Sequence, residues 1–171
     1  NYLLEVDNGY GTGYSNLVTQ TGLSYKHDGL IAGQSYKYRV SAQNFLGYGP
    51  TSSEFIFKPI VAPSKPPNPP TNNPASTTQT VIHLGYEAVE DDGGASISHY
   101  NIYIDDGLDG AFGTAIPNGL ALTYSTSALT LVTGRTYRFK YSAENSIGPG
   151  PLSDEVAILL AELPGAPTAF T

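Results

Sequence analysis

The sequence predicts an all-β protein made of antiparallel β-sandwiches, and three observations lead to this fold class. Apolar and polar residues alternate over several short stretches, as they do in strands with one buried face. Gly and Pro account for 19 and 13 of the 171 residues, and both favour turns between short strands. No stretch repeats apolar residues at the three- and four-residue spacing of a helix.

The composition excludes several kinds of partner. The net charge is −7, and the eight Lys and Arg residues are scattered along the chain. Nucleic acids and anionic membranes both require clustered cations, so we expect neither as a partner. No run of eighteen apolar residues occurs, so we expect no membrane insertion in this segment. The absence of Cys excludes disulfides, thiolate metal sites and cysteine nucleophiles.

One sequence pattern occurs twice in the chain. Residues 33–50 return as residues 134–151, at an offset of 101. Residues 2–9 return as residues 100–107 at an offset of 98, so the second copy carries a short insertion between these blocks. A period near one hundred residues is too long for a solenoid repeat and fits whole domains in tandem.

The alternation predicts the strands of each copy and the faces they present. In the second copy, one strand points its apolar residues inward at Tyr137, Phe139, Tyr141 and Ala143. In the first copy, the same strand has the inward residues Tyr36, Tyr38, Val40 and Ala42 and the outward residues Lys37, Arg39, Ser41 and Gln43. Further inward rows are formed by Ile82, Leu84 and Tyr86, and by Tyr100, Ile102 and Ile104. The sequences Asp-Asn-Gly at 7–9 and Asp-Asp-Gly at 105–107 predict turns, because these residues tolerate positive φ.

Residues 131–150 carry Leu, Gly, Tyr, Phe, Tyr, Ala, Asn, Gly and Gly at a spacing that residues 30–49 largely repeat. This pattern resembles the F-strand signature of the fibronectin type III family. The resemblance implies tandem fibronectin type III-like (immunoglobulin-like) sandwiches, with Tyr36 and Tyr137 as tyrosine-corner residues whose hydroxyls bond back to the E–F turn. Structural roles are also expected for the signature positions Gly33, Gly134, Asn44 and Asn145. Tyr86 stands on strand B where the family usually has Trp, so we expect a slightly less stable core.

The resemblance also implies the domain organisation. Residues 1–62 correspond to a domain that lacks strands A and B, residues 63–162 to a complete domain, and residues 163–171 to the start of a further domain. In the complete domain the expected strands are A at 68–72, B at 79–86, C at 98–105, C′ at 112–116, E at 121–127, F at 136–145 and G at 153–161. The Pro-rich junction at 63–70 favours extended polyproline geometry and is expected to be a semi-rigid spacer.

No motif has the spacing of an active site or of a metal site. His27, His83 and His99 lack the spacing of a metal-ligand pair, and we expect neither catalysis nor a cofactor. Acidic residues gather at 90–93 and 105–110, in the B–C and C–C′ turns. We interpret both stretches as solvated turns, because the ligand spacing of a calcium loop is missing; whether they bind calcium stays open.

These features predict a non-catalytic structural and interaction segment of a long multi-domain extracellular or cell-surface protein, such as a rod, filament or adhesive array. The expected partners are other copies of the same domain array or other surface proteins. Two alternatives remain: a spacer module of a secreted carbohydrate-active enzyme, and an intracellular cytoskeletal or axonemal scaffold. If residues 1–171 were the whole chain, the incomplete first sandwich would take a strand from a neighbouring subunit.

Overall fold

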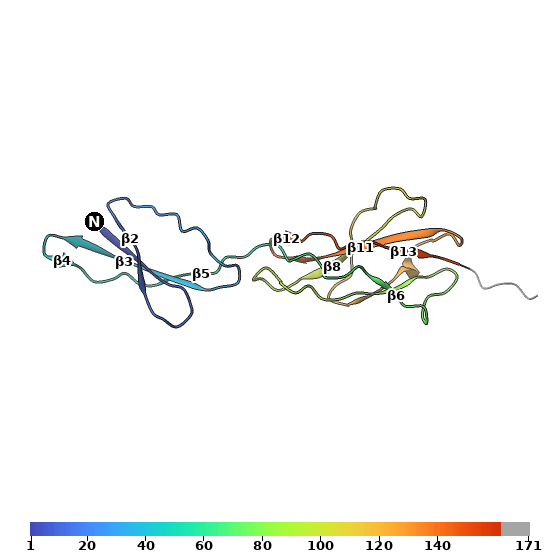
Figure 1. The fold of residues 1–171 in the computed structure, drawn as a ribbon, viewed down its shortest axis with the longest axis horizontal. Coiled ribbons are helices and arrows are strands. Elements are labelled where there is room, and N and C mark those ends of the chain that lie inside the picture. Colours follow the sequence, from blue (N-terminus) through green and yellow to red (C-terminus); the bar gives the residue numbers. More distant parts are fainter. Residues whose placement is uncertain (162–171) are drawn as a thin grey trace, which may run out of the picture. The chain divides into compact units, whose positions relative to one another are not determined.

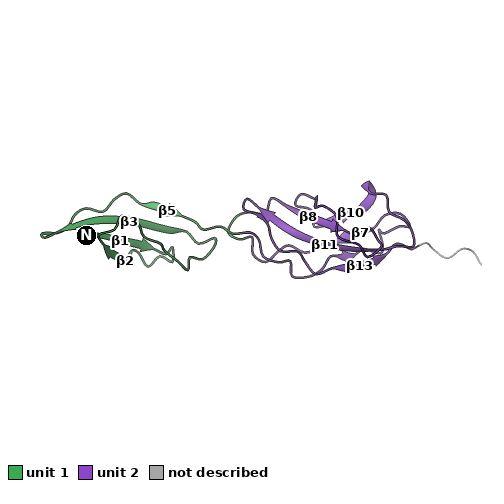
Figure 2. Ribbon diagram, turned by 90° about the horizontal axis from the view of Figure 1, so that it is seen from above, with its two compact units in different colours: residues 1–61, 93–95 green, residues 62–92, 96–171 purple. Residues whose placement is uncertain are grey.

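The computed structural model describes residues 1–161, and these residues form two compact units (Figure 2). Unit 1 consists of Asn1–Val61 with Gly93–Ala95, and unit 2 of Ala62–Asp92 and the residues from Ser96 onward. The strands of both units pair in antiparallel fashion. The predicted start of a further domain at 163–171 lies outside the described residues.

Unit 1 is a single five-stranded sheet (Figure 1). Its strands are β1 (Tyr2–Asp7), β2 (Ser15–Gln20), β3 (Tyr36–Asn44), β4 (Gly47–Tyr48) and β5 (Phe55–Phe57). Their order is β2-β1-β3-β4, and β5 pairs with β3 as well. The long strand β3 is therefore the centre of the unit, and it lies between β1 and β5 along its first half.

Unit 2 contains two sheets. The larger sheet has the order β12-β11-β8-β9, with β13 also paired to β11, and the smaller sheet has the order β10-β7-β6. The strands are β6 (Thr71–Asn72), β7 (His83–Gly85), β8 (His99–Ile104), β9 (Ile116–Pro117), β10 (Thr123–Ser125), β11 (Thr136–Asn145), β12 (Gly148–Pro149) and β13 (Val156–Leu159). A short 3-10 helix, η1 (Thr126–Ala128), follows β10. Within residues 1–161 no helix is long and apolar enough to cross a bilayer.

The core of unit 2 joins the inward residues of both sheets. Strand β7 and the residues directly before and after it contribute Ile82, Leu84 and Tyr86, as the alternation predicts. The larger sheet contributes Tyr100, Ile102, Tyr137, Phe139, Tyr141, Ala143 and Ile158. Burial of these side chains is the main favourable contribution to the stability of the unit.

The observed strands agree with the predicted ones to different degrees. Strand F is predicted at 136–145, and β11 has these bounds. The strands expected at 68–72, 79–86, 98–105, 121–127 and 153–161 are present but shorter, as β6, β7, β8, β10 and β13. The strand C′ expected near 112–116 overlaps the observed strand only at Ile116, because β9, which pairs with β8, is at Ile116–Pro117.

The predicted inward row of the first copy is only partly buried. Tyr36 is buried, but Val40 is 38% exposed and Ala42 is also exposed. Ser41, predicted to face outward, is buried. The alternation assigns Val40 to the face that Tyr141 has in unit 2, but within the described residues no second sheet covers that face of unit 1. A strand pattern predicts which side chains share a face and does not predict whether another layer covers it.

Candidate functional site

The two tyrosines predicted as corner residues occupy the first and second positions of the central strands. Tyr36 begins β3, and its hydroxyl accepts a hydrogen bond of 3.0 Å from the backbone N of Ile31. Tyr137 is the second residue of β11, and its hydroxyl accepts a bond of 2.8 Å from the backbone N of Val132. Each bond spans five residues and closes the turn that enters the strand, so both units carry the same contact.

The signature glycines and asparagines lie in the turns at the two ends of these strands. Gly134 has a φ of 87°, which favours glycine, and its N donates to the Leu160 carbonyl. Gly33 has a φ of 79° in the same turn of unit 1. At the other end, Asn44 Oδ1 accepts from Leu46 N at 2.8 Å, and Asn145 Oδ1 accepts from Ile147 N at 2.9 Å. These four positions define the turns before and after the central strand.

Tyr86 lies inside unit 2, where its ring packs against two other tyrosines. The ring centroids are 5.6 Å from Tyr100 and 4.7 Å from Tyr141. Its hydroxyl donates to the Ala121 carbonyl at 2.7 Å and accepts from Asn118 Nδ2 at 2.5 Å. Burial raises the pKa of the Tyr86 phenol. A Trp at this position would lack the hydroxyl, so these two hydrogen bonds distinguish the tyrosine from the residue usual in the family.

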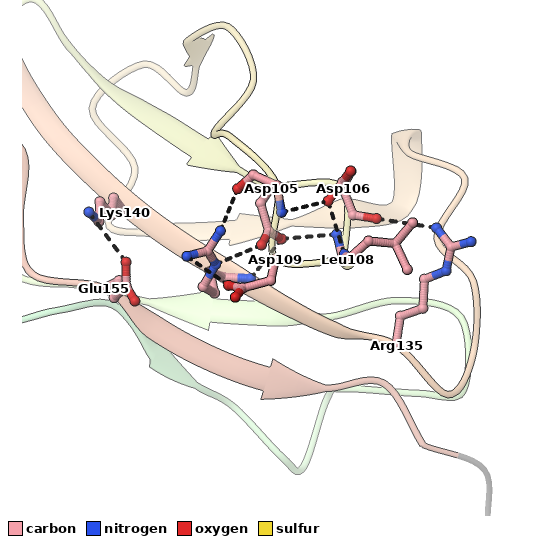
Figure 3. Close-up of polar contacts among 10 residues, drawn as sticks. Asp105, Asp106, Leu108, Asp109, Arg135, Lys140 and Glu155 are labelled. Carbon is pink, nitrogen blue, oxygen red and sulfur yellow. Dashed lines mark hydrogen bonds and ion pairs between the residues drawn. The ribbon is translucent and has the colours of Figure 1, made fainter.

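The interpretation of 105–110 as a solvated turn is wrong for Asp105. Its side chain is buried and lies 2.8 Å from Arg138 Nε, and it also accepts from the backbone N of Arg138 at 3.0 Å and of Gly107 at 3.1 Å (Figure 3). Asp109 pairs with Arg138 Nη1 at 3.0 Å, and Arg138 Nη2 donates to the Gly110 carbonyl. One arginine on β11, the strand paired with β8, therefore holds the turn that follows β8, and sequence spacing does not reveal this contact.

The electrostatics of Asp105 follow from this environment. Burial alone raises the pKa of its carboxyl, but the hydrogen bonds from Arg138 and Gly107 and the guanidinium charge outweigh that effect and lower the pKa. The group is thus a carboxylate at neutral pH, and its oxygens are already occupied by three N–H donors.

The remaining acids of this turn also have partners within the protein. Asp106 Oδ1 accepts from Leu108 N at 2.9 Å and from Gly110 N at 3.2 Å. Among the described residues, no three His, Asp or Glu side chains lie close enough together to hold a metal ion.

One group of side chains in unit 2 has the order of a Ser–His–acid triad. Ser98 Oγ lies 3.0 Å from His99 Nδ1, and His99 Nε2 lies 3.3 Å from Glu144 Oε2. The Ser98 hydroxyl, however, also lies 3.0 Å from the backbone carbonyl of Glu144, which competes with the imidazole for its single proton. Asn101 Nδ2 also donates to Glu144, at 2.7 Å. This arrangement ties β8 to β11 through side chains of both strands.

Unit 1 has an apolar groove on one face of its sheet, which we call the open face. It is lined by Leu4, Tyr25, His27, Leu30, Tyr38, Arg39, Val40, Phe55 and Phe57. Leu4 and Val40 lie opposite each other, as Ile102 and Tyr141 do in unit 2, where the corresponding face is buried in the core. His27 Nδ1 lies 2.8 Å from the Tyr38 hydroxyl, and its ring meets those of Tyr36 and Tyr38 edge-on. The open face therefore has the composition of a sandwich interior.

Comparison with known proteins gives relatives of much greater length. No family model matches the sequence. The proto-oncogene tyrosine-protein kinase ROS of Gallus gallus is 26% identical over 158 residues, covering 86% of this chain and 7% of that protein. The receptor-type tyrosine-protein phosphatase S of Gallus gallus is 28% identical over 152 residues, covering 88% of this chain and 10% of that protein. The fibronectin type-III domain-containing protein 3a of Gallus gallus is 30% identical over 133 residues, covering 78% of this chain and 10% of that protein. The chain thus spans a tenth or less of the length of these relatives.

Comparison with solved structures shows the fold. The solution structure of a human fourth FNIII domain matches with a TM-score of 0.52 and 18% sequence identity, covering 64% of this chain and 88% of that one. The antiparallel sheets, together with the tyrosine hydroxyl bonds in the turns before β3 and β11, define a small β-sandwich module. The resemblance that the F-strand signature indicates is confirmed, and the chain has the fibronectin type III fold.

Proposed function

We propose that this chain is a non-catalytic structural and interaction segment of a long multi-domain extracellular or cell-surface protein, in which it acts as part of a rod, filament or adhesive array. The observation that carries this proposal is the repetition of one pairing register in both units. Tyr2 lies opposite Ala42 in unit 1, and Tyr100 lies opposite Ala143 in unit 2. Tandem domains that repeat one architecture are typical of proteins that space or display binding surfaces.

The polar groups of the larger sheet support a structural role. Arg138 is engaged by Asp105, Asp109 and the Gly110 carbonyl, and it closes a turn. Glu144 accepts hydrogen bonds or ion pairs from residues on the neighbouring strand. Each of these groups stabilises a connection between strands of unit 2. The binding partners that we propose for the segment are other copies of the array or other surface proteins.

The proposed location rests on similarity to a receptor-type protein, the receptor-type tyrosine-protein phosphatase S. An antibody raised against residues 1–171 would test it on the native polypeptide. We expect intact cells of the source to expose the epitope, so that a membrane-impermeant biotin reagent labels the captured protein. Labelling only after lysis would contradict the proposal and favour the intracellular scaffold. Recovery of the epitope in the culture medium on a polypeptide with glycoside hydrolase activity would favour the carbohydrate-active enzyme.

We further propose that residues 1–62 belong to a domain whose strands A and B are not among the described residues, that residues 63–162 form a complete domain, and that residues 163–171 begin another. The open face supports this, because its counterpart in unit 2 packs against Ile82, Leu84 and Tyr86 of the smaller sheet. Residues 122–124 of that sheet, which include part of β10, correspond in sequence to residues 23–25, which form no strand in unit 1. In a complete domain, a strand equivalent to β7 would pair with residues 23–25, as β7 pairs with β10 in unit 2.

A chimera tests this domain assignment with the chain's own sequence. Residues 63–98 placed directly before Asn1 would supply equivalents of β6 and β7 to unit 1. We expect the chimera to show a cooperative unfolding transition for unit 1 and to lose the binding of an apolar dye to the open face. The matched control carries Leu84→Asp in the added segment only. Equal dye binding by the chain, the chimera and the control would contradict the assignment.

A further inference from the structure

The turn between β1 and β2 of unit 1 places reactive backbone and side-chain groups next to each other. The chain contains two Asn-Gly pairs, Asn8–Gly9 and Asn118–Gly119. Asn8 and Gly9 are both exposed. The backbone N of Gly9 donates to Asp7 Oδ1 at 2.9 Å, and Asn8 Oδ1 accepts from the backbone N of Tyr10 at 3.2 Å. The Asp7 carboxylate thus lies next to the backbone N–H of Gly9, and the backbone N–H of Tyr10 lies next to the side-chain amide oxygen of Asn8.

We propose that Asn8–Gly9 is a site of spontaneous deamidation, a modification that does not depend on the function proposed above. The backbone N of Gly9 attacks Asn8 Cγ while the Asp7 carboxylate takes the N–H proton, and Tyr10 N stabilises the negative charge on the amide oxygen. The Asp7 carboxyl then returns the proton to Asn8 Nδ2, the Cγ–Nδ2 bond breaks and ammonia leaves, while the new bond from Cγ to the backbone N of Gly9 closes a five-membered succinimide. Water opens the ring at either carbonyl and gives aspartate or isoaspartate at position 8. Glycine favours the first step because it has no Cβ to hinder the approach.

The second Asn-Gly pair provides an internal contrast. Asn118 is half-buried, and its Nδ2 donates to the Thr123 carbonyl at 2.7 Å and to the Tyr86 hydroxyl at 2.5 Å. Its side chain must leave both partners before the amide carbon can meet the backbone N of Gly119. Breaking two hydrogen bonds of this kind slows the reaction of Asn118 relative to Asn8 by roughly tenfold or more.

Unit 2 indicates which product unit 1 can accommodate. Asp106 stands in the second copy where Asn8 stands in the first, and its Oδ1 accepts from Leu108 N just as Asn8 Oδ1 accepts from Tyr10 N. An aspartate at position 8 therefore keeps the turn. An isoaspartate lengthens the backbone of residue 8 by one methylene directly before Gly9, and at Gly9 even an added Cβ would lie 2.5 Å from the Ser35 carbonyl oxygen. We expect the isoaspartate form to destabilise unit 1.

Peptide mapping by mass spectrometry tests the proposal on the 171-residue chain incubated at neutral pH. We expect the replacement of amide nitrogen by oxygen to accumulate at position 8, with position 118 reacting at least about tenfold more slowly. In the chain unfolded in urea the two positions should react at similar rates. The variant Asp7→Asn retains an acceptor for Gly9 N but is a poor base, and we expect it to slow the reaction at Asn8 by at least about threefold without affecting Asn118.

Three results would overturn the proposal. Equal rates at the two positions in the folded chain would show that the turn gives Asn8 no advantage. An unchanged rate of deamidation in Asp7→Asn would show that the Asp7 carboxylate does not act as the base. The same ratio of rates in folded and unfolded chains would assign the difference to local sequence and not to structure. The variant Asn8→Asp should unfold as the unmodified chain does, and marked destabilisation of this variant would contradict the comparison with unit 2.

Discussion

Replacing Tyr137 by phenylalanine removes one oxygen atom from the interior of unit 2. The side chain is only 3% exposed, and its hydroxyl is the acceptor for Val132 N at 2.8 Å. In Tyr137→Phe the ring keeps its apolar contacts, but the N–H of Val132 loses its partner. An unmade hydrogen bond of this kind costs about 1 to 2 kcal/mol of the free energy of unfolding. For a domain of this size the midpoint of thermal unfolding would fall by roughly 5 to 10 °C.

A urea titration of the whole chain, monitored through hydrogen–deuterium exchange of the amides in β8 and β11, measures the unfolding of unit 2. The matched control is Tyr103→Phe on β8, because the Tyr103 hydroxyl makes no hydrogen bond within residues 1–161. We expect the control to change the free energy of unfolding by less than about 0.5 kcal/mol. Equal effects of the two substitutions would refute the reasoning that Tyr137 acts through its hydroxyl.

Three further predictions concern unit 2. Asp105→Asn should lower the free energy of unfolding by about 2 kcal/mol at neutral pH, because it breaks the pair with Arg138. Since the pKa of Asp105 is lower in the folded than in the unfolded protein, its contribution is complete above the unfolded pKa and disappears as the pH falls through the folded pKa. Urea titrations at neutral and acidic pH should therefore show the difference between this variant and the unsubstituted chain vanish in acid, and a constant difference would contradict the assignment. Tyr86→Trp should lower the free energy of unfolding by about 1 to 2 kcal/mol despite its larger area, contrary to the expectation drawn from the family, because the Ala121 carbonyl and Asn118 Nδ2 lose the hydroxyl as a partner; a more stable variant would show that area dominates. Ser142→Ala should leave stability unchanged or raise it by up to about 1 kcal/mol, because the buried Oγ has no hydrogen-bond partner within the described residues; a clear loss in the same titration would reveal a partner for it.

The local pattern of the sequence predicts much of the fold. The alternation of Tyr137, Phe139 and Tyr141 predicts a half-buried strand, and β11 occupies the predicted residues. Such a strand is specified by its own residues, because every second side chain must be apolar to reach the core. The short strands at the edges are less well predicted, since their ends depend on where a neighbouring strand stops pairing. C′ is the clearest case, displaced to β9.

The candidate sites were harder to predict, because each depends on contacts between distant parts of the chain. Asp105 has the sequence context of a solvated turn, and only the approach of Arg138, 33 residues away, makes it a buried carboxylate. Val40 has the pattern of a core residue, yet it is exposed because its unit has one sheet. In both cases the residue type is compatible with two environments, and tertiary structure decides between them.

The intact mass and peptide map of the native polypeptide that contains this segment test the tandem-array proposal most directly. We predict a very large chain with further copies of the Gly-x-x-Tyr strand signature at intervals near one hundred residues. A chain that joins a few such domains to an unrelated catalytic region would contradict the structural-array proposal and make this segment an enzyme's spacer. A native mass near 18.1 kDa, that of the segment alone, would contradict both and leave strand exchange between subunits to cover the open face.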